Sequence, residues 1–411
     1  MIPFSVILWF STCLISILNF IMMSWVFLII KSRKEKNQKT SKYPKISVLI
    51  PAYNEEKNIA KCLKSVISSN YPKNKLEIIV VDDGSKDDTY KIASKFKRVK
   101  VFKIRHRGKW NAIKFGLKKC HGKFTLILDA DTVIDKNAIK MMLKKMKKDV
   151  GAATIVPKIA NNKNMLTTFQ QIEYMLNSIT RKGMNALSLG NMYVWGCGTI
   201  YRTKLLKRMR FKKSLTEDFY LTVEIQKLGY KVVISEKSFG YTRVPENLRD
   251  FVRQRIRWAL GPIPVIKNNL KLLFNKKYKS LGYYSLPLQI FWYPYITLIT
   301  PLIFIQIFHW IPYQNSIFKL SWYFFTWFSL AGPLYSIYMI PTWGFSIHTI
   351  VGILPAFFST FLILYSLKKF REKIGIKQIF AIFFFFPYCL LINFCFIAAI
   401  FLFFIKRFSF W

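Results

Sequence analysis

The stretch Leu-Glu-Ile-Ile-Val-Val-Asp-Asp-Gly-Ser, residues 76–85, decides the fold that we expect. Its apolar half, Leu76–Val81, has the length of a buried strand and ends in two carboxylates and a glycine. A second apolar run, Ile46–Ile50, ends in the same way in the string Pro51–Glu56. In open parallel sheets, ligands bind beyond the carboxyl ends of the strands. These two polar strings are therefore the first candidates for a binding site.

Helix-like segments separate the apolar runs. Asn58–Ser68 follows the first run and Asp88–Phe96 follows the second, and further short strands are expected at Val99–Ile104 and Phe124–Leu128. Strands that alternate with helices indicate an α/β fold with a parallel sheet. We therefore expect one α/β domain at residues 45–244.

Apolar segments enclose this domain. The chain has 411 residues, of which 52% are hydrophobic and 17% aromatic, and this is too apolar for two soluble domains. Residues 1–30 carry no charge and exceed the roughly 20 residues that cross a bilayer core. The segment lacks a basic start and is longer than the apolar core of a signal peptide, so we expect an uncleaved transmembrane anchor. Residues 245–283 are expected to form interfacial helices, and 284–411 transmembrane helices.

A basic linker at 31–44 suggests the orientation of a multi-pass protein of the cell membrane. Its residues Lys31, Arg33, Lys34, Lys36 and Lys39 follow the anchor, and basic residues beside a span mark the cytoplasmic side. The catalytic domain is therefore expected in the cytoplasm. Four C-terminal hydrophobic stretches conflict with the same rule, because they would place the basic loop Lys368–Lys377 outside. Either one stretch is interfacial or re-entrant, with a break at Pro341, or this loop is an exception. The stretches are Tyr284–Pro312, Leu320–Ile340, Phe345–Leu367 and Gln378–Ile405.

The net charge of +44 limits the possible partners. Nucleic-acid binding is one candidate, but the lysines are scattered and no nucleic-acid-binding fingerprint is present, so we expect no nucleic-acid partner. A bilayer with anionic lipids and an anionic substrate explain the charge better. The six cysteines show no paired spacing, which suits reduced thiols and indicates no zinc site.

Asp129 and Asp131 follow the expected strand Phe124–Leu128 with one residue between them, so both carboxylates can face one point. Oxygen ligands of this kind suit Mg²⁺ or Mn²⁺, which would offset the charge of a nucleoside diphosphate. The structural alternative is a solvated turn that caps the next helix. Asp83 lies in an Asp-Gly turn that could equally be structural, while Tyr53 and Glu55 are placed to contact a base.

Two later motifs suit catalysis and diphosphate binding. Glu217 and Asp218 open a helix, where carboxylates usually favour the helix dipole, although Asp218 in this position can also act as a base. In Gln254, Arg257 and Trp258, the guanidinium suits a diphosphate and the indole suits a sugar ring. The alternative for this motif is an Arg-Trp belt at the membrane interface.

Together these motifs resemble the processive family 2 inverting glycosyltransferases with the GT-A fold, such as hyaluronan, chitin, cellulose and poly-N-acetylglucosamine synthases. The resemblance covers about Lys45 to Trp258. It implies that Asp131 binds the metal directly with Asp129 in the same motif, and that Asp218 is the base beside Glu217. It further implies a nucleotide site and an acceptor site. The nucleotide site would contain Pro51, Tyr53, Glu55, Asp83, Lys109 and Asp129, and the acceptor and diphosphate site Gly196, Cys197, Gly198, Gln254, Arg257 and Trp258.

This resemblance implies a metal-dependent enzyme that transfers sugar from a UDP-sugar, UDP-N-acetylglucosamine or UDP-glucose, to a growing β-linked polysaccharide and exports it. One alternative is transfer of a single sugar to a membrane lipid, either ceramide or a polyprenyl phosphate. The Gln-x-x-Arg-Trp element counts against the polyprenyl phosphate branch. A third alternative is a non-enzymatic membrane scaffold, against which the intact acidic motifs argue.

Overall fold

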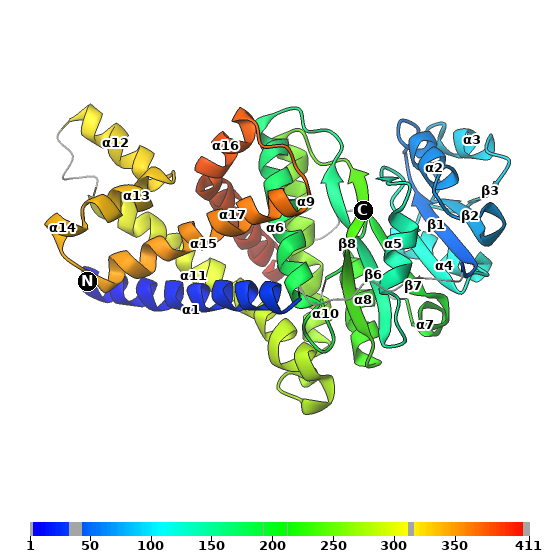
Figure 1. The fold of residues 1–411 in the computed structure, drawn as a ribbon, viewed down its shortest axis with the longest axis horizontal. Coiled ribbons are helices and arrows are strands. Elements are labelled where there is room, and N and C mark those ends of the chain that lie inside the picture. The colour runs from blue at the N-terminus through cyan, green and yellow to red at the C-terminus, as the bar shows by residue number, and fades with distance from the viewer. Residues whose placement is uncertain (1–2, 33–42, 192, 212, 311–315, 406–411) are drawn as a thin grey trace.

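The computed structural model describes residues 3–32, 43–191, 193–211, 213–310 and 316–405. Most of the expected basic linker, with Arg33, Lys34, Lys36 and Lys39, lies outside the described residues. A sheet with its covering helices occupies one end of the molecule, and long apolar helices occupy the other (Figure 1). The arrangement agrees with an α/β domain joined to a helical membrane region.

Among the described residues, eight strands form one mixed sheet, in which the four strands predicted from the sequence pair in parallel with one another. A further parallel pair, β6 with β8, lies in the other half of the sheet. The strand order is β3-β2-β1-β4-β7-β6-β8-β5. Strand β7 runs antiparallel to both β4 and β6, a reversal that the sequence did not predict. The strands are β1 (Ile46–Ala52), β2 (Leu76–Asp82), β3 (Val99–Lys103), β4 (Phe124–Leu128), β5 (Val133–Ile134), β6 (Val150–Ile159), β7 (Gly198–Arg202) and β8 (Lys231–Thr242).

The helices of the sheet domain confirm the predicted alternation. They are α2 (Ile59–Ile67), α3 (Thr89–Ser94), α4 (Lys109–Lys119), α5 (Ala138–Lys145), α6 (Met165–Met184), α7 (Thr203–Arg208) and α8 (Glu217–Lys227). Helix α6 starts where the Asn164 side chain accepts a hydrogen bond from the Thr167 N–H. It contacts β6 and β8 on one side and apolar helices on the other, so it joins the two parts of the molecule.

After β8 the chain forms α9 (Leu248–Leu260) and α10 (Pro262–Lys267), then three short helices, η3 (Leu270–Leu272), η4 (Lys276–Tyr278) and η5 (Leu281–Ser285). Phe251 near the start of α9 and Leu260 at its end both pack against one apolar helix, α17 (Phe385–Phe404). The side chains of α9 thus connect the sheet domain with the apolar region.

Four described helices are long and apolar enough to cross a membrane: α1 (Phe4–Lys31), α11 (Leu286–Trp310, with η5 before it), α15 (Ile347–Lys369) and α17. The hydrophobic stretch predicted at Leu320–Ile340 does not form such a helix. It is divided among α12 (Ile317–Trp327), α13 (Ala331–Tyr338) and α14 (Ile340–Trp343), which lie at the far end from the sheet (Figure 1). Another short helix, α16 (Ile376–Phe383), precedes α17.

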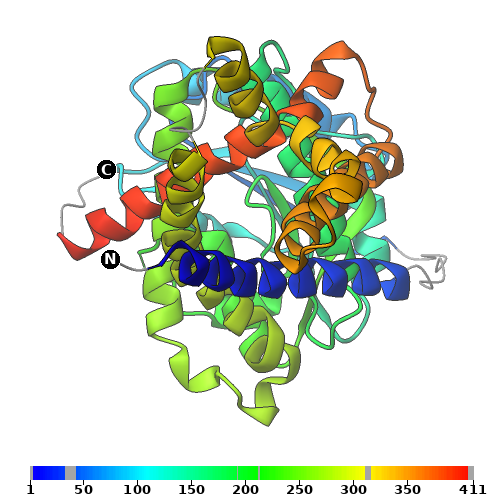
Figure 2. The ribbon, with the colours of Figure 1, turned by 90° about the vertical axis from the view of Figure 1, so that its left-hand side faces the viewer.

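Polar side chains join the apolar helices to one another. Thr12 of α1 lies 2.7 Å from Nδ1 of His348 in α15, and Asn19 of α1 donates to the Val351 carbonyl at 3.0 Å. Gln306 of α11 donates to Ser11 at 2.6 Å. Hydrogen bonds between helices are a common source of association in lipid. Figure 2 shows α1 crossing in front of the sheet, with α15 and α17 above it.

The loop at Lys368–Lys377 lies against the sheet domain. Lys158 of β6 donates to the Phe370 carbonyl at 2.8 Å and pairs with Glu372 at 2.9 Å. Lys182 of α6 donates to Ser32, directly after α1, at 3.3 Å. The ends of α1 and α15 therefore meet the same domain. Because the stretch at Leu320–Ile340 is broken, two candidate spans, α11 and α15, separate the domain from this loop in the sequence, and an even number of spans would put both on the same side of a membrane.

Candidate active site

Lys109 is the centre of the candidate site. Its Nζ lies 2.7 Å from Oδ1 of Asp129 and 2.6 Å from Oε1 of Glu217, so it joins two acidic motifs separated by almost 90 residues. Burial alone would lower the pKa of Lys109, but the two carboxylates raise it well above its usual value. The same cation lowers the pKa of Glu217 against the effect of burial. Lys109 therefore remains charged at physiological pH.

The start of α4 is held in place by Asp83. Its Oδ1 accepts from the Arg107 N–H at 3.1 Å and its Oδ2 from the Gly108 N–H at 2.7 Å. Gly108 has a φ of +96°, a conformation that favours glycine. Asp83 was predicted to contact a nucleotide, whereas its described contacts position the turn that presents Lys109.

Asp129 and Asp131 follow β4, as predicted, and both are near Glu55. Burial raises the pKa of Asp131 to about 7, and the charges of Asp129 and Glu55 reinforce the shift. Burial likewise raises the pKa of Asp129, although Lys109 opposes it. The described contacts of Asp131 come from the hydroxyls of Thr132 at 3.1 Å and Thr242 at 3.4 Å. Negative charge is therefore concentrated here with little compensation around Asp131.

This arrangement fits a divalent cation that arrives with a diphosphate. Within the described residues no group of three or more His, Cys, Asp or Glu side chains can hold a metal ion. Mg²⁺ typically binds one or two carboxylates and completes its shell with water and phosphate oxygens. The carboxylate of Asp131, with Asp129 beside it, matches such a partial ligand set.

The predicted nucleotide residues lie around the end of β1. Tyr53 stacks on His106 with ring centroids 4.1 Å apart, and the Tyr53 side chain is exposed, which leaves its ring partly available to a base. Glu55 accepts from the Asn58 side chain at 2.8 Å, and burial raises its pKa. Pro51 lies inside β1, buried opposite Val81 of β2.

Asp218 lies in the first turn of α8, next to the glycine loop before β7. A methyl group on Gly196 would lie 3.1 Å from Oδ2 of Asp218 and 3.6 Å from Lys109 Nζ. Cys197 is buried, and its carbonyl accepts from the Asp129 N–H at 3.3 Å, while Gly198 starts β7. The structure thus brings this loop beside Asp218 and the motif of Asp129.

Burial raises the pKa of Asp218 to about 6, and the charge of Glu217 adds to the shift. Because its carboxylate is lost below this value, we expect kcat/KM to fall about tenfold per pH unit below about pH 6. A pH profile of initial rates measures this limb, and in Asp218→Asn the limb should disappear from the residual rate. An unchanged acid limb in the variant would assign it to another group.

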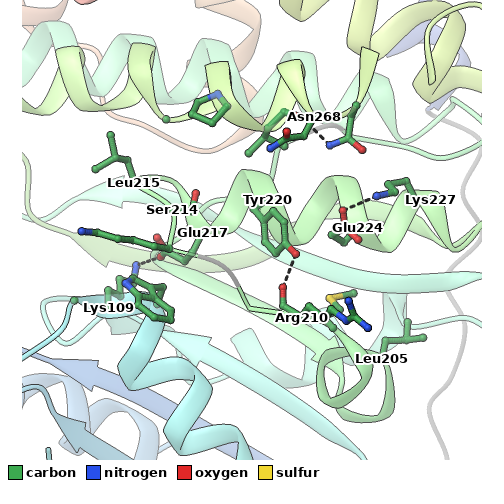
Figure 3. A pocket seen from close by; sticks show the side chains of 18 of the residues that line it. Lys109, Leu205, Arg210, Ser214, Leu215, Glu217, Tyr220, Glu224, Lys227 and Asn268 are labelled. Atoms are coloured by element: carbon green, nitrogen blue, oxygen red, sulfur yellow. Dashed lines mark hydrogen bonds and ion pairs between the residues drawn. The ribbon is translucent and has the colours of Figure 1, made fainter. Parts of the chain in front are cut away.

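A cavity of about 960 Å³ opens beside Lys109 and Glu217. Figure 3 shows these two side chains at one end, with the pairs Tyr220–Arg210 and Glu224–Lys227 farther along. Arg257 of α9 also lines the cavity. The charge of Arg257 lowers the pKa of Asp129, Glu217 and Asp218, so two cations, Lys109 and Arg257, lie near these carboxylates.

Helix α9 brings the Gln-x-x-Arg-Trp motif to this site. Gln254 and Arg257 line a smaller cavity of about 450 Å³, and the buried Oε1 of Gln254 has no hydrogen-bond partner among the described residues. A methyl group on Gly261 would lie 2.3 Å from Cγ2 of Thr216, so only glycine allows the end of α9 to approach the start of α8 so closely. The end of the helix that carries the diphosphate motif therefore packs on the start of the helix that carries the catalytic pair.

Trp258 is held by residues that the sequence did not identify. The Arg255 guanidinium lies 4.4 Å from the Trp258 ring centroid and forms two hydrogen bonds with Glu173 of α6, at 2.8 and 2.7 Å. Tyr388 of α17 donates to the same carboxylate. Glu173 is the only acidic residue of α6, and this isolated charge was a signal that could have identified it.

Comparisons with known proteins identify a family match within this chain. The family described as Glycosyl transferase family 2 matches residues 47–210. A poly-beta-1,6-N-acetyl-D-glucosamine synthase of Staphylococcus epidermidis is 32% identical over 246 residues, which are 57% of this chain and 59% of that protein. A probable glycosyltransferase of Bacillus subtilis is 31% identical over 251 residues, 58% of this chain and 60% of that protein. The chain thus aligns with about three-fifths of the length of these relatives.

A solved structure shares the fold. The mannosyltransferase of Pyrobaculum calidifontis, in complex with GDP-Man and Mn²⁺, has a TM-score of 0.59 at 17% identity and matches 87% of this chain and 99% of its own. The mixed sheet is therefore of the GT-A kind, as the sequence predicted. The chain carries a glycosyltransferase family 2 domain, with apolar helices on both sides of it in the sequence.

Proposed function

We propose that this chain is a membrane glycosyltransferase that extends a β-linked polysaccharide from a UDP-sugar, with UDP-N-acetylglucosamine as the donor. The observation that carries the proposal is the contact of Lys109 with both Asp129 and Glu217, with Asp218 adjacent. This contact supports a single site with cations suited to a diphosphate, a cluster of carboxylates and a proposed base. The name of the relative from Staphylococcus epidermidis supports the choice of sugar.

In the proposed reaction an acceptor hydroxyl attacks the anomeric carbon of the donor. The new glycosidic bond forms as the bond to the diphosphate breaks, UDP departs, and the configuration at that carbon inverts. Asp218 takes the hydroxyl proton. Lys109 and Arg257 stabilise the negative charge that develops on the diphosphate. A divalent cation bound at Asp131 and Asp129 would supply further charge compensation there.

The membrane region gives the proposed product a route. We infer that the catalytic domain lies in the cytoplasm against anionic lipid, because the charge of the chain is strongly positive and Lys31 directly ends α1. The helices α1, α11 and α15, which polar contacts join to one another, would flank the path of the exported chain.

A product assay tests the function. The full chain in lipid nanodiscs is incubated with radiolabelled UDP-N-acetylglucosamine, UDP-glucose or UDP-mannose in separate samples, with Mg²⁺ or Mn²⁺. We expect water-soluble polymer from UDP-N-acetylglucosamine that is absent from the Asp218→Asn variant. A wild-type product that is only an organic-extractable monoglycosyl lipid would contradict the polymerase and indicate the lipid-acceptor alternative.

Trp258→Ala tests whether the enzyme retains its product. The indole would hold the terminal sugar of a chain of any length, and stacking on sugar and aromatic faces contributes up to about 1–2 kcal/mol. We expect donor hydrolysis to persist while products longer than a few sugars disappear. Sizing of radiolabelled product by gel filtration measures this change. Full-length polymer from Trp258→Ala would exclude the indole as the acceptor platform.

A further inference from the structure

Arg181 of α6 is a largely buried cation without an acidic partner. Among the described residues no hydrogen bond or ion pair to its guanidinium is formed, and Nη1 is buried and unsatisfied. Its guanidinium carbon lies 3.8 Å from the ring centroid of Trp195 and 5.7 Å from that of Tyr193. Burial lowers the pKa of Arg181 to about 10, so it is still charged at neutral pH. An unpaired buried charge is costly unless a ligand compensates it.

The surroundings of Arg181 contain other unfilled polar groups. Nε1 of Trp195 is also buried without a hydrogen-bond partner, and Trp195 directly precedes Gly196, which faces Asp218. Tyr193 and Tyr174 pack beside these groups. The unsatisfied polar groups of this cluster are N–H donors, and the side chains around them are aromatic.

The cluster around Arg181 lies apart from the residues around Lys109 that are proposed to bind the nucleotide-sugar donor. Glu217 lines the large cavity and pairs with Lys109, whereas Asp218 faces Gly196 and its charge acts on Arg181. Adjacent residues of a helix project about 100° apart, so the two carboxylates face different sides of α8. Tyr193 packs in the same apolar cluster as Tyr293 of the apolar helix α11, and Gln289 of that helix is also a neighbour of Tyr193. The cluster therefore lies between the base and the apolar helices.

We propose that Arg181 and Trp195 form an acceptor subsite for the acetamido group of an N-acetylated sugar. Their N–H groups would donate to the amide oxygen, and the aromatic rings would pack on its methyl group. A carboxylate or phosphate ligand fits less well, because Asp129, Glu217 and Asp218 already concentrate negative charge nearby. A free amine would be protonated and repelled by Arg181. The subsite deepens the proposed function and rests on it.

Binding of two matched acceptors tests the subsite. A β-linked N-acetylglucosamine oligosaccharide and its chemically de-N-acetylated form are titrated by calorimetry into the full chain in nanodiscs with UDP and Mg²⁺. Hydrogen bonds to charged groups are worth about 1.5–3 kcal/mol, so we expect about 10- to 100-fold preference for the acetylated form. Arg181→Met should bring the preference to within about twofold, with UDP affinity unchanged.

Two further variants separate binding from folding. Trp195→Phe removes the indole N–H and keeps an aromatic ring, so it should reduce the preference in part. Arg249→Met, which removes an exposed arginine of α9, should retain it. The subsite would be overturned if Arg181→Met lowered the affinities for the acetylated and the de-N-acetylated oligosaccharide equally. It would also be overturned if the wild-type chain made polymer but bound the two oligosaccharides with equal affinity. A wild-type chain that makes no polymer from any UDP-sugar would instead overturn the proposed function.

Discussion

Asp218→Asn is expected to lower the rate of sugar transfer by about 10²–10⁴-fold, the usual contribution of general base catalysis. Asparagine keeps the size of the side chain and can still accept from the Phe219 N–H, which lies 2.8 Å from Oδ1. It cannot take a proton from the acceptor hydroxyl. Single-turnover kinetics with radiolabelled donor should therefore show slow chemistry, while calorimetry shows UDP affinity close to that of the wild type.

A matched control is Asp149→Asn, which makes the same change at an exposed position far from the motifs. It should transfer sugar at the rate of the wild type. Loss of UDP affinity in Asp218→Asn with retained turnover would show that Asp218 only caps α8, and the base would then lie elsewhere.

Asp131→Asn is expected to reduce transfer by about 10³-fold or more. Its carboxylate is proposed to bind the cation that offsets the diphosphate charge, and such stabilisation is typically worth several kcal/mol. The measurement is turnover at saturating Mn²⁺ or Mg²⁺, together with UDP binding at increasing metal concentration. The variant should lose most of the metal dependence of UDP binding.

Protein stability provides the control for Asp131→Asn. Burial and two neighbouring carboxylates raise the pKa of Asp131, so ionising it opposes folding near neutral pH when no cation is bound. The variant should therefore unfold at an equal or higher temperature than the wild type in chelator. Turnover within a few-fold of the wild type at saturating metal would remove Asp131 from the metal site.

The sequence predicted the four parallel strands β1 to β4, and three of them, β1, β2 and β4, are mainly apolar runs followed by polar residues. It did not predict that β7 lies between β4 and β6 in the opposite direction, since this pairing depends on contacts far apart in the chain. The break after Trp327 was also missed, because the residues around it remain apolar and the hydropathy pattern continues.

Within the candidate site, local motifs identified the residues that gather around Lys109. They could not show that Asp83 positions the turn at Gly108, because an Asp-Gly string suits a ligand contact and a structural turn equally. Arg181 was missed for a different reason. In a chain with 64 lysine and arginine residues, one more arginine in a helix carries little information until its lack of an acidic partner is visible.

The contacts of Lys158 and Lys182 have a consequence for movement during synthesis. They attach the domain to the ends of two apolar helices, at Phe370 and Ser32. If these helices cross the membrane as proposed, the reaction centre would be held at a constant height above the bilayer. In a polymerising enzyme the domain then cannot approach the membrane with each cycle. The polymer itself would then advance by the length of one sugar after every addition, past a protein that stays in place.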